Sequence, residues 1–215
     1  PFQNLNFSPA MSSLHYGQSI FEGMKAYRKE DKIYTFRAKD NFERLNKSAN
    51  RMCMPNIPNE LVMEALEQLL KLDQKRIPDN DSNSLYLRPF MFATDEYVGI
   101  RPSETYKFII FGCPVGSYYT EPLKVKIESH YTRAANGGVG EAKAAGNYAA
   151  SLYPAKLAKE EGYHQLLWTD SKEHKYIEES GTMNVMFVID GKLITPDLSG
   201  TILPGITRKS VLEIV

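Results

Sequence analysis

Apolar residues recur at helical spacing in two stretches of the first half of the chain. Asp40 stands three residues before Glu43, which is the spacing of a capping box at the start of a helix. Asn59 precedes the second stretch, and Pro55 and Pro58 separate the two. The stripes comprise Phe42, Leu45, Ala49 and Met52 in the first and Val62, Ala65, Leu66, Leu69 and Leu70 in the second. This pattern predicts two amphipathic helices that contribute to a core.

Short apolar runs bounded by turn residues predict strands. We expect them at residues 24–27, 32–36, 84–93, 106–112, 125–129, 165–168, 174–178, 185–189 and 192–195. The first two and the last two of these strands form hairpins, since Lys29-Glu30-Asp31 and Asp190-Gly191 are turn sequences. Two further helices are expected at residues 147–161 and 206–215.

Pro114 and Gly116 interrupt the apolar pattern and indicate a domain boundary. We therefore expect a small N-terminal domain, a linker and a larger C-terminal domain, at residues 1–113, 114–121 and 122–215. The mixture of helices and strands in both domains predicts an α/β (α+β) fold.

Both ends of the sequence indicate a portion of a longer polypeptide. Pro1 is not an initiator methionine, and Val215 falls inside the amphipathic run that begins at Ile206. We expect the C-terminal domain to continue beyond this helix.

Composition narrows the class of protein. The 215 residues are 42% hydrophobic and 24% charged, which is typical of a soluble globular protein. With 26 basic and 26 acidic residues, the chain has no general attraction to nucleic acid or to acidic membranes. Its longest apolar run is too short to cross a bilayer. The two cysteines lack a Cys-x-x-Cys spacing, which favours a reducing compartment and argues against a disulfide framework. We expect a cytoplasmic location and no metal site.

One lysine, Lys143, lies among glycines and alanines in residues 137–151. Small neighbours let a planar partner approach the amine, and poor solvation lowers the pKa of an ammonium and exposes its nucleophilic form. Schiff-base chemistry requires such an accessible, deprotonated lysine amine. Tyr148, in the first turn of the helix predicted at 147–161, could hydrogen-bond the same ligand.

Two other interpretations of Lys143 are open. It could be a solvated lysine in a flexible loop, or it could bind a phosphate. The phosphate loop of nucleotide-binding proteins is disfavoured, because that motif places a hydroxyl residue after the lysine whereas Ala144 follows here.

Two more segments carry polar groups at turns. Glu178 and Glu179 are adjacent at the end of the strand predicted at 174–178, and adjacent side chains of extended backbone point to opposite faces, so only one of them is expected to enter a given site. Residues 200–208 form a glycine-proline turn that opens a helix, whose N–H groups favour a phosphate. Tyr86 and Arg88 share one strand face, and Arg88 could equally be an edge-strand charge.

Five motifs in order resemble those of the branched-chain amino acid aminotransferases. They are residues 15–26 (HYGQSIFEGMKA), 85–89 (LYLRP), the Lys143 segment, 179–184 (ESGTMN) and 203–205 (LPG). The resemblance covers essentially the whole chain. It implies fold type IV of the pyridoxal-phosphate enzymes, with a small α/β domain, a larger pseudo-barrel domain and the cofactor between them.

The resemblance also implies roles for individual residues. Lys143 resembles the lysine that forms the Schiff base with pyridoxal 5′-phosphate, Tyr148 the tyrosine at its 3-oxygen, and Glu179 the carboxylate at its ring nitrogen. Arg44 resembles the phosphate-binding arginine, and Ile206 and Thr207 would offer backbone N–H groups to the phosphate. Substrate-pocket positions match Tyr16, Phe21, Tyr86, Arg88 and Tyr118.

The implied activity is ping-pong transamination of L-leucine, L-isoleucine and L-valine with 2-oxoglutarate, which yields 2-oxo acids and L-glutamate. The resemblance implies a homodimer, and the loop at residues 97–100 is the segment expected to reach the partner subunit. D-amino acid aminotransferase and aminodeoxychorismate lyase, which share the lysine and the glutamate, are alternatives within the fold. A phosphate-ligand binding module without catalysis is the alternative from another class.

Overall fold

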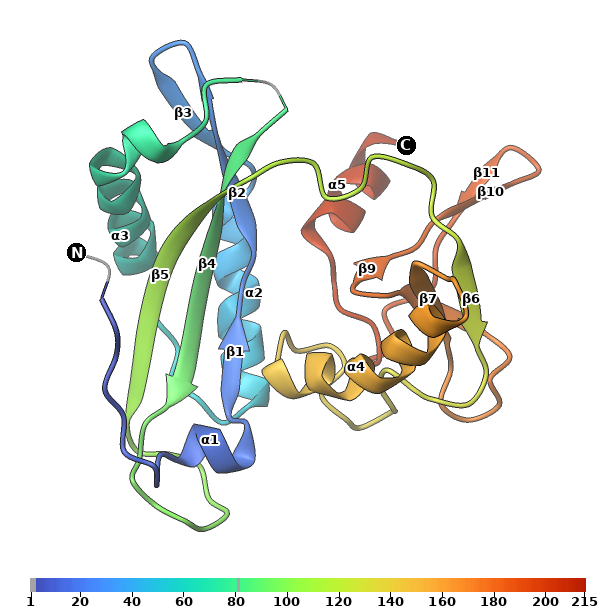
Figure 1. The fold of residues 1–215 in the computed structure, drawn as a ribbon, viewed down its shortest axis with the longest axis horizontal. Coiled ribbons are helices and arrows are strands. Elements are labelled where there is room, and N and C mark those ends of the chain that lie inside the picture. The colour runs from blue at the N-terminus through green and yellow to red at the C-terminus, as the bar shows by residue number, and fades with distance from the viewer. Residues whose placement is uncertain (1–2, 81) are drawn as a thin grey trace. The chain divides into compact units, whose positions relative to one another are not determined.

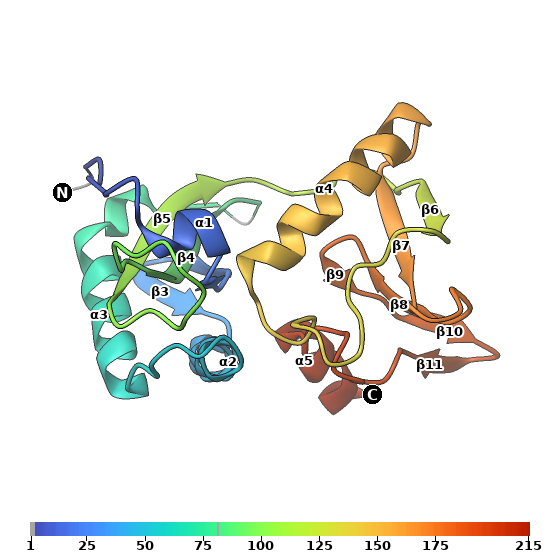
Figure 2. The same cartoon turned by 90° about the horizontal axis from the view of Figure 1, so that it is seen from below.

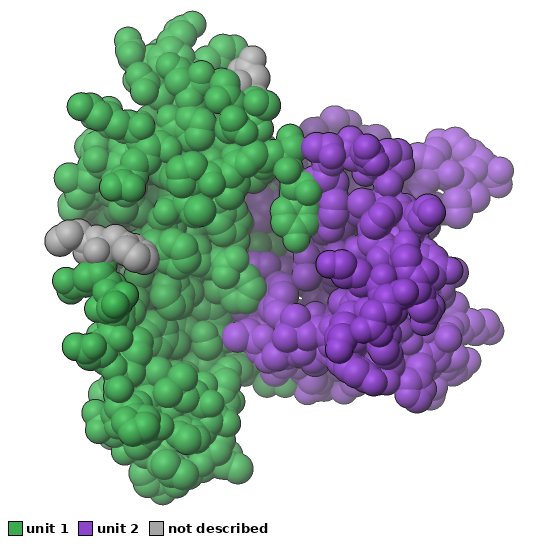
Figure 3. Space-filling view, viewed as in Figure 1, with its two compact units in different colours: residues 1–118 green, residues 119–215 purple. Residues whose placement is uncertain are grey.

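A computed structural model describes residues 3–80 and 82–215 of the chain. It contains two compact units, residues 1–118 and 119–215, which Figure 3 colours separately and whose elements Figure 1 labels. The division falls inside the segment expected to be a linker.

Unit 1 is built on a five-stranded antiparallel sheet with a long central strand, β4 (Ser84–Ala93). One edge of β4 pairs along its whole length with β5 (Tyr106–Val115), and the other edge is shared by β1 (Ser19–Phe21) and β2 (Met24–Lys29). The strand β3 (Lys32–Thr35) completes the sheet as the hairpin partner of β2. The sheet therefore holds β1, β2 and β4 in fixed register.

Helices α2 (Ala38–Arg51) and α3 (Asn59–Leu72) pack together and against this sheet (Figures 1 and 2). Their predicted apolar stripes supply much of the core, in which Phe42, Leu45 and Leu66 meet Leu85 and Leu87 of β4. Three short elements of this unit, α1 (Ser12–Tyr16), β1 and the 3-10 turn η1 (Gln74–Arg76), were not predicted, because they are too short to show a period.

The predicted helix starts are wrong in detail. Arg37, in the left-handed region at φ +51°, precedes α2, and no side chain caps the helix. Asp40 instead pairs with the Arg37 side chain at 2.6 Å. Asn59 is the first residue of α3 and not its cap, which is Pro58.

The strand β5 ends later than expected, since Pro114 and Val115 still pair with β4. An edge strand tolerates proline.

Unit 2 contains a four-stranded sheet in the order β6, β7, β8, β9 (Val125–Glu128, Gln165–Thr169, Ile177–Ser180 and Met183–Asn184). Strands β6 and β7 are parallel, and α4 (Ala145–Glu160) lies between them in sequence as the crossover. Ala158, Leu166 and Trp168 form the centre of its core. The indole N–H of Trp168 donates to the Gly181 carbonyl at 2.9 Å, which ties β7 to the turn after β8.

The hairpin β10–β11 (Phe187–Ile189 and Lys192–Ile194) turns at Asp190-Gly191 as predicted. Both turn residues have positive φ, +50° and +72°, which this tight turn requires. Strand β8 begins three residues later than the predicted start at 174 because the Asp170 carboxylate accepts four backbone N–H bonds and closes a turn before it. These bonds hold the pKa of Asp170 well below its usual range.

Helix α5 (Ile206–Ile214) follows the Leu203-Pro204-Gly205 turn. Within the described residues, no helix has the length and apolarity that crossing a membrane requires. The same residues contain no group of three or more His, Cys, Asp or Glu side chains placed to bind a metal ion.

Candidate active site

Lys143 lies in the turn that leads into α4. The helix begins at Ala145, two residues before the predicted start, and Tyr148 occupies its first turn. The Lys143 Nζ and the Tyr148 Oη are 2.8 Å apart, so the amine and the phenol share a hydrogen bond. Lys143 is half-buried between Ala142 and Ala144, which are both buried.

Packing of the backbone fixes this turn. The Asn147 side-chain amide donates to the carbonyls of Val139 and Ala142 at 2.8 and 2.9 Å. Gly140 must be glycine, because a Cβ there would lie 2.5 Å from the Ala134 Cβ and 2.6 Å from the Thr201 carbonyl oxygen. These hydrogen bonds and close contacts stabilise the turn that carries Lys143.

Both carboxylates of β8 are buried, and they have different partners, as the alternation of strand side chains predicts. Glu178 accepts a hydrogen bond from the Thr201 hydroxyl at 2.6 Å. Glu179 accepts from the Leu203 N–H at 2.7 Å and from the Asn184 amide at 3.2 Å. Glu179 lines a small pocket with Tyr148, so the structure brings these two predicted residues together.

Arg133 is the main residue of this site that the sequence did not reveal. Its Nε lies 2.5 Å from the Glu179 carboxylate, and its guanidinium also donates to the carbonyls of Gly140 and Thr201 at 3.1 and 2.8 Å. One side chain thus joins the turn before Lys143, strand β8 and the segment before α5. No local pattern marks this role, because its partners Glu179 and Thr201 are distant in sequence.

The ionisation of Glu179 reflects opposing effects. Burial raises the pKa of Glu179 to about 7, and the Arg133 charge, the Leu203 N–H and the Lys143 charge each act to lower it. Lys143 is therefore close enough to influence this carboxylate. A positive charge next to Glu179 would favour its ionised form further.

The start of α5 offers backbone donors near Glu179. Gly205 precedes the helix, and the N–H groups of Ile206 and Thr207 belong to its first turn, where no intrahelical acceptor exists. The Leu203 N–H bond to Glu179 links this turn to β8. A Cβ at Gly205 would lie 1.9 Å from the Asn184 amide oxygen, so a larger residue here would displace the Asn184 side chain.

In unit 1, three predicted substrate residues form one cluster. Arg88 donates to the Tyr86 hydroxyl at 2.9 Å, and its guanidinium carbon lies 4.4 Å from the centroid of the Phe21 ring. The prediction that Tyr86 and Arg88 share a face is thus confirmed. Tyr16 and Tyr118 are exposed, at 41% and 83% of their surface.

Arg44 is buried in unit 1. Its guanidinium makes two hydrogen bonds of 2.8 Å to the carboxylate of Glu22, whose side chain is completely buried. Such a bidentate pair fixes the orientation of the guanidinium.

A family model described as amino-transferase class IV matches residues 19–215. The chain belongs to the class IV aminotransferases. Among curated relatives, branched-chain-amino-acid aminotransferase 2 of Bacillus subtilis (strain 168) is 49% identical over 219 residues, covering 100% of this chain and 60% of the relative. The branched-chain-amino-acid aminotransferase of Mycolicibacterium smegmatis is 44% identical and covers 100% of this chain and 61% of its own length. This class IV chain thus spans about 60% of the length of the curated relatives it matches.

Solved structures agree with the assignment to class IV. The branched-chain amino acid aminotransferase of Escherichia coli has a TM-score of 0.84 at 30% identity, covering 97% of this chain and 68% of that chain. The T.th. branched-chain amino acid aminotransferase with pyridoxamine 5′-phosphate has a TM-score of 0.84 at 27% identity, covering 100% and 70%. The predicted α/β fold of type IV is therefore confirmed. Class IV aminotransferases are pyridoxal-phosphate enzymes.

Proposed function

We propose that this chain belongs to a pyridoxal-phosphate-dependent transaminase acting on L-leucine, L-isoleucine and L-valine with 2-oxoglutarate. The observation that carries the proposal is the 2.8 Å contact of the Lys143 amine with the Tyr148 phenol, in the unit that also buries Glu179. The names of the branched-chain relatives support the substrate class.

The polar groups that unit 2 brings together fit this cofactor. Lys143 would hold it covalently, Tyr148 would hydrogen-bond its 3-oxygen, and Glu179 would face its ring nitrogen. The N–H groups of Ile206 and Thr207 would bind its phosphate, and the family resemblance implies the same role for Arg44. When bound, pyridoxal phosphate supplies an electron sink for the charge left when a substrate Cα loses its proton.

The side chains of the chain supply the proton chemistry. The Lys143 amine is the base that would take up and return a proton, and the Tyr148 hydroxyl within hydrogen-bond distance would orient it. Glu179 acts through its negative charge. Arg133 and the Leu203 N–H counter the effect of burial and favour that charge.

The substrate side chain would meet the cluster of Phe21, Tyr86 and Arg88, with Tyr16 and Tyr118 as further wall residues. Aromatic faces suit a branched apolar side chain, whereas a guanidinium suits the second carboxylate of glutamate. The 2.9 Å bond to Tyr86 would position Arg88 for this second role. One pocket could then accept both partners of the exchange.

Covalent trapping tests the cofactor site. The chain is incubated with pyridoxal phosphate, reduced with borohydride, digested and examined by mass spectrometry. We expect the adduct on Lys143, its loss in Lys143→Ala and its retention in Lys156→Ala, an exposed lysine of α4. Absence of the adduct from the wild-type chain would favour the phosphate-ligand binding module instead.

An amino-donor panel tests the substrate class. L-leucine, L-isoleucine, L-valine and D-alanine are offered separately with 2-oxoglutarate, and glutamate formation is measured. We expect activity with the three L-donors. Activity confined to D-alanine would contradict the substrate proposal and leave the cofactor proposal intact.

The homodimer and the cytoplasmic location implied by the sequence remain predictions. An exposed apolar loop supports a subunit contact, since Tyr97, Val98 and Ile100 expose 47%, 67% and 94% of their surface. Sedimentation equilibrium of the chain would measure its mass. A purely monomeric species at tens of micromolar concentration would count against the dimer.

A further inference from the structure

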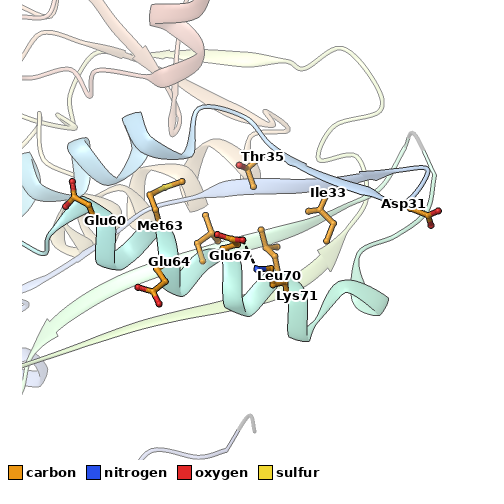
Figure 4. Close-up of a pocket in the computed structure, with 10 residues that line it drawn as sticks. Asp31, Ile33, Thr35, Glu60, Met63, Glu64, Glu67, Leu70 and Lys71 are labelled. Atoms are coloured by element: carbon orange, nitrogen blue, oxygen red, sulfur yellow. Dashed lines mark ion pairs between the residues drawn. The ribbon is translucent and has the colours of Figure 1, made fainter.

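A groove in unit 1 is lined by none of the residues proposed above to bind cofactor or substrate. It is formed between α3 and the strand β3 with its preceding turn, and its volume is about 570 Å³ (Figure 4). Small-molecule sites in proteins commonly have volumes of about 300–1,000 Å³. The groove is thus large enough for a ligand.

The floor of the groove is apolar. Leu66 and Leu70 are buried, whereas Ile33 and Met63 are only half-buried. Met63, Leu66 and Leu70 recur at helical spacing on α3, and Ile33 of β3 lines the same groove. Figure 4 labels Ile33, Met63 and Leu70. The half-buried members leave apolar surface in contact with solvent, which a ligand could cover.

The rim of the groove is acidic. Its carboxylates are Asp31, Glu60, Glu64 and Glu67. Among the described residues that line the groove, Lys71 is the single cation, and it lies 2.7 Å from Glu67, the ion pair drawn in Figure 4. Asp31 also pairs with Arg28, outside the lining, at 3.9 Å. Four carboxylates and one ammonium leave the lining with a formal charge of −3.

The acidic residues repel one another. Glu60 and Glu64 are four residues apart on α3, so like charges face each other on one side of the helix. Glu64 receives a hydrogen bond only from the neutral Gln68 amide, at 3.1 Å, among the bonds described for α3. A cation bound beside them would relieve this repulsion, whereas an anion would increase it.

We propose that this groove binds a small hydrophobic ammonium, a ligand with an apolar body and a protonated amine but no carboxylate. The apolar body would cover Ile33 and Met63, and the amine would lie beside Glu60 and Glu64. Zwitterionic amino acids are excluded, because their carboxylate would face the acidic rim. The site is independent of the proposed cofactor chemistry.

Methyl NMR of the full chain labelled at methionine tests the proposal. The probe is n-hexylammonium, and hexanoate and L-leucine are the charge controls. We expect a saturable shift of the Met63 methyl signal with n-hexylammonium alone, and weaker binding when the salt concentration is raised. Equal shifts with hexanoate, or no shift with millimolar n-hexylammonium, would overturn the proposal.

Matched variants test which carboxylates contribute to binding of the amine. Glu60→Gln and Glu64→Gln should each raise the Kd for n-hexylammonium by about two- to fivefold, the range of exposed ion pairs. Glu43→Gln, a carboxylate exposed on α2 and outside the groove, should leave the Kd unchanged. These exposed glutamines preserve helix formation, so misfolding would not mimic the effect. An unchanged Kd in both groove variants would contradict a carboxylate-bound amine.

Discussion

Glu179 shows how one residue couples the proposed function to stability. Burial raises the pKa of Glu179 to about 7 from the ordinary value of 4.5, so between these pH values the folded chain holds a proton that the unfolded chain releases. The contribution of Glu179 to stability is therefore fully present below pH 4.5 and is lost as the pH rises through 7. The total loss is about 3 kcal/mol.

Urea unfolding of the cofactor-free chain checks this expectation. Between about pH 5 and about pH 8, the wild type should lose unfolding free energy relative to Glu179→Gln, because the glutamine cannot titrate. The glutamine variant also controls for other titrating groups. The same difference at both pH values would mean that Glu179 is already ionised at pH 5.

Arg133 provides the second residue-scale prediction. Arg133→Met leaves the buried Glu179 carboxylate without its cationic partner, which typically costs about 3–5 kcal/mol. The loss should be smaller at about pH 5, where Glu179 is protonated. Adding Glu179→Gln should recover part of the stability at about pH 8, and a double-mutant cycle measures this coupling by urea unfolding. Additive effects of the two substitutions would show that the pair is not coupled.

At the scale of elements, two glycines near Lys143 should respond oppositely to alanine. In Gly140→Ala the new Cβ meets the Ala134 Cβ and the Thr201 carbonyl, so we expect a loss of about 1–3 kcal/mol. Gly146→Ala meets nothing within 4 Å inside α4 and should stabilise the chain by about 0.5–1 kcal/mol. Denaturant unfolding of both variants measures the effects. Equal effects would show that the turn is not tightly packed.

The elements with a strong period were predictable from the sequence. Strand β4 matches its predicted bounds because it is one continuous run of apolar and aromatic residues, and α2 and α3 follow from their stripes. The helix caps were not predictable in the same way. An arginine in the left-handed region precedes α2, which the usual residue preferences do not predict, and its side chain pairs with Asp40.

The residues of the candidate site also differ in how well the sequence predicts them. Lys143 and Tyr148 are five residues apart, so the pattern of one local segment predicts both. Arg133 reaches Thr201 over 68 residues, and no spacing along the chain records such a contact. Long-range polar networks depend on the folded arrangement of several segments, which explains why Arg133 was missed.

At the scale of the whole molecule, the cofactor should act as a stabilising ligand. A ligand that binds only the folded chain adds about 2.7 kcal/mol of stability at 100 times its Kd. We expect pyridoxal phosphate to raise the melting temperature of the wild-type chain and of Lys156→Ala, and to raise that of Lys143→Ala much less. Differential scanning calorimetry measures all three. A full shift of the melting temperature in Lys143→Ala would show that the lysine does not contribute to cofactor binding.

Trp168 gives the molecule an optical probe. It is the single tryptophan of the sequence, it is buried in the core of unit 2, and its indole bonds to the Gly181 carbonyl two residues from Glu179. All tryptophan fluorescence therefore originates within unit 2. Because solvent exposure changes the emission wavelength of an indole, the spectrum reports the state of this unit without a label, whatever happens in unit 1.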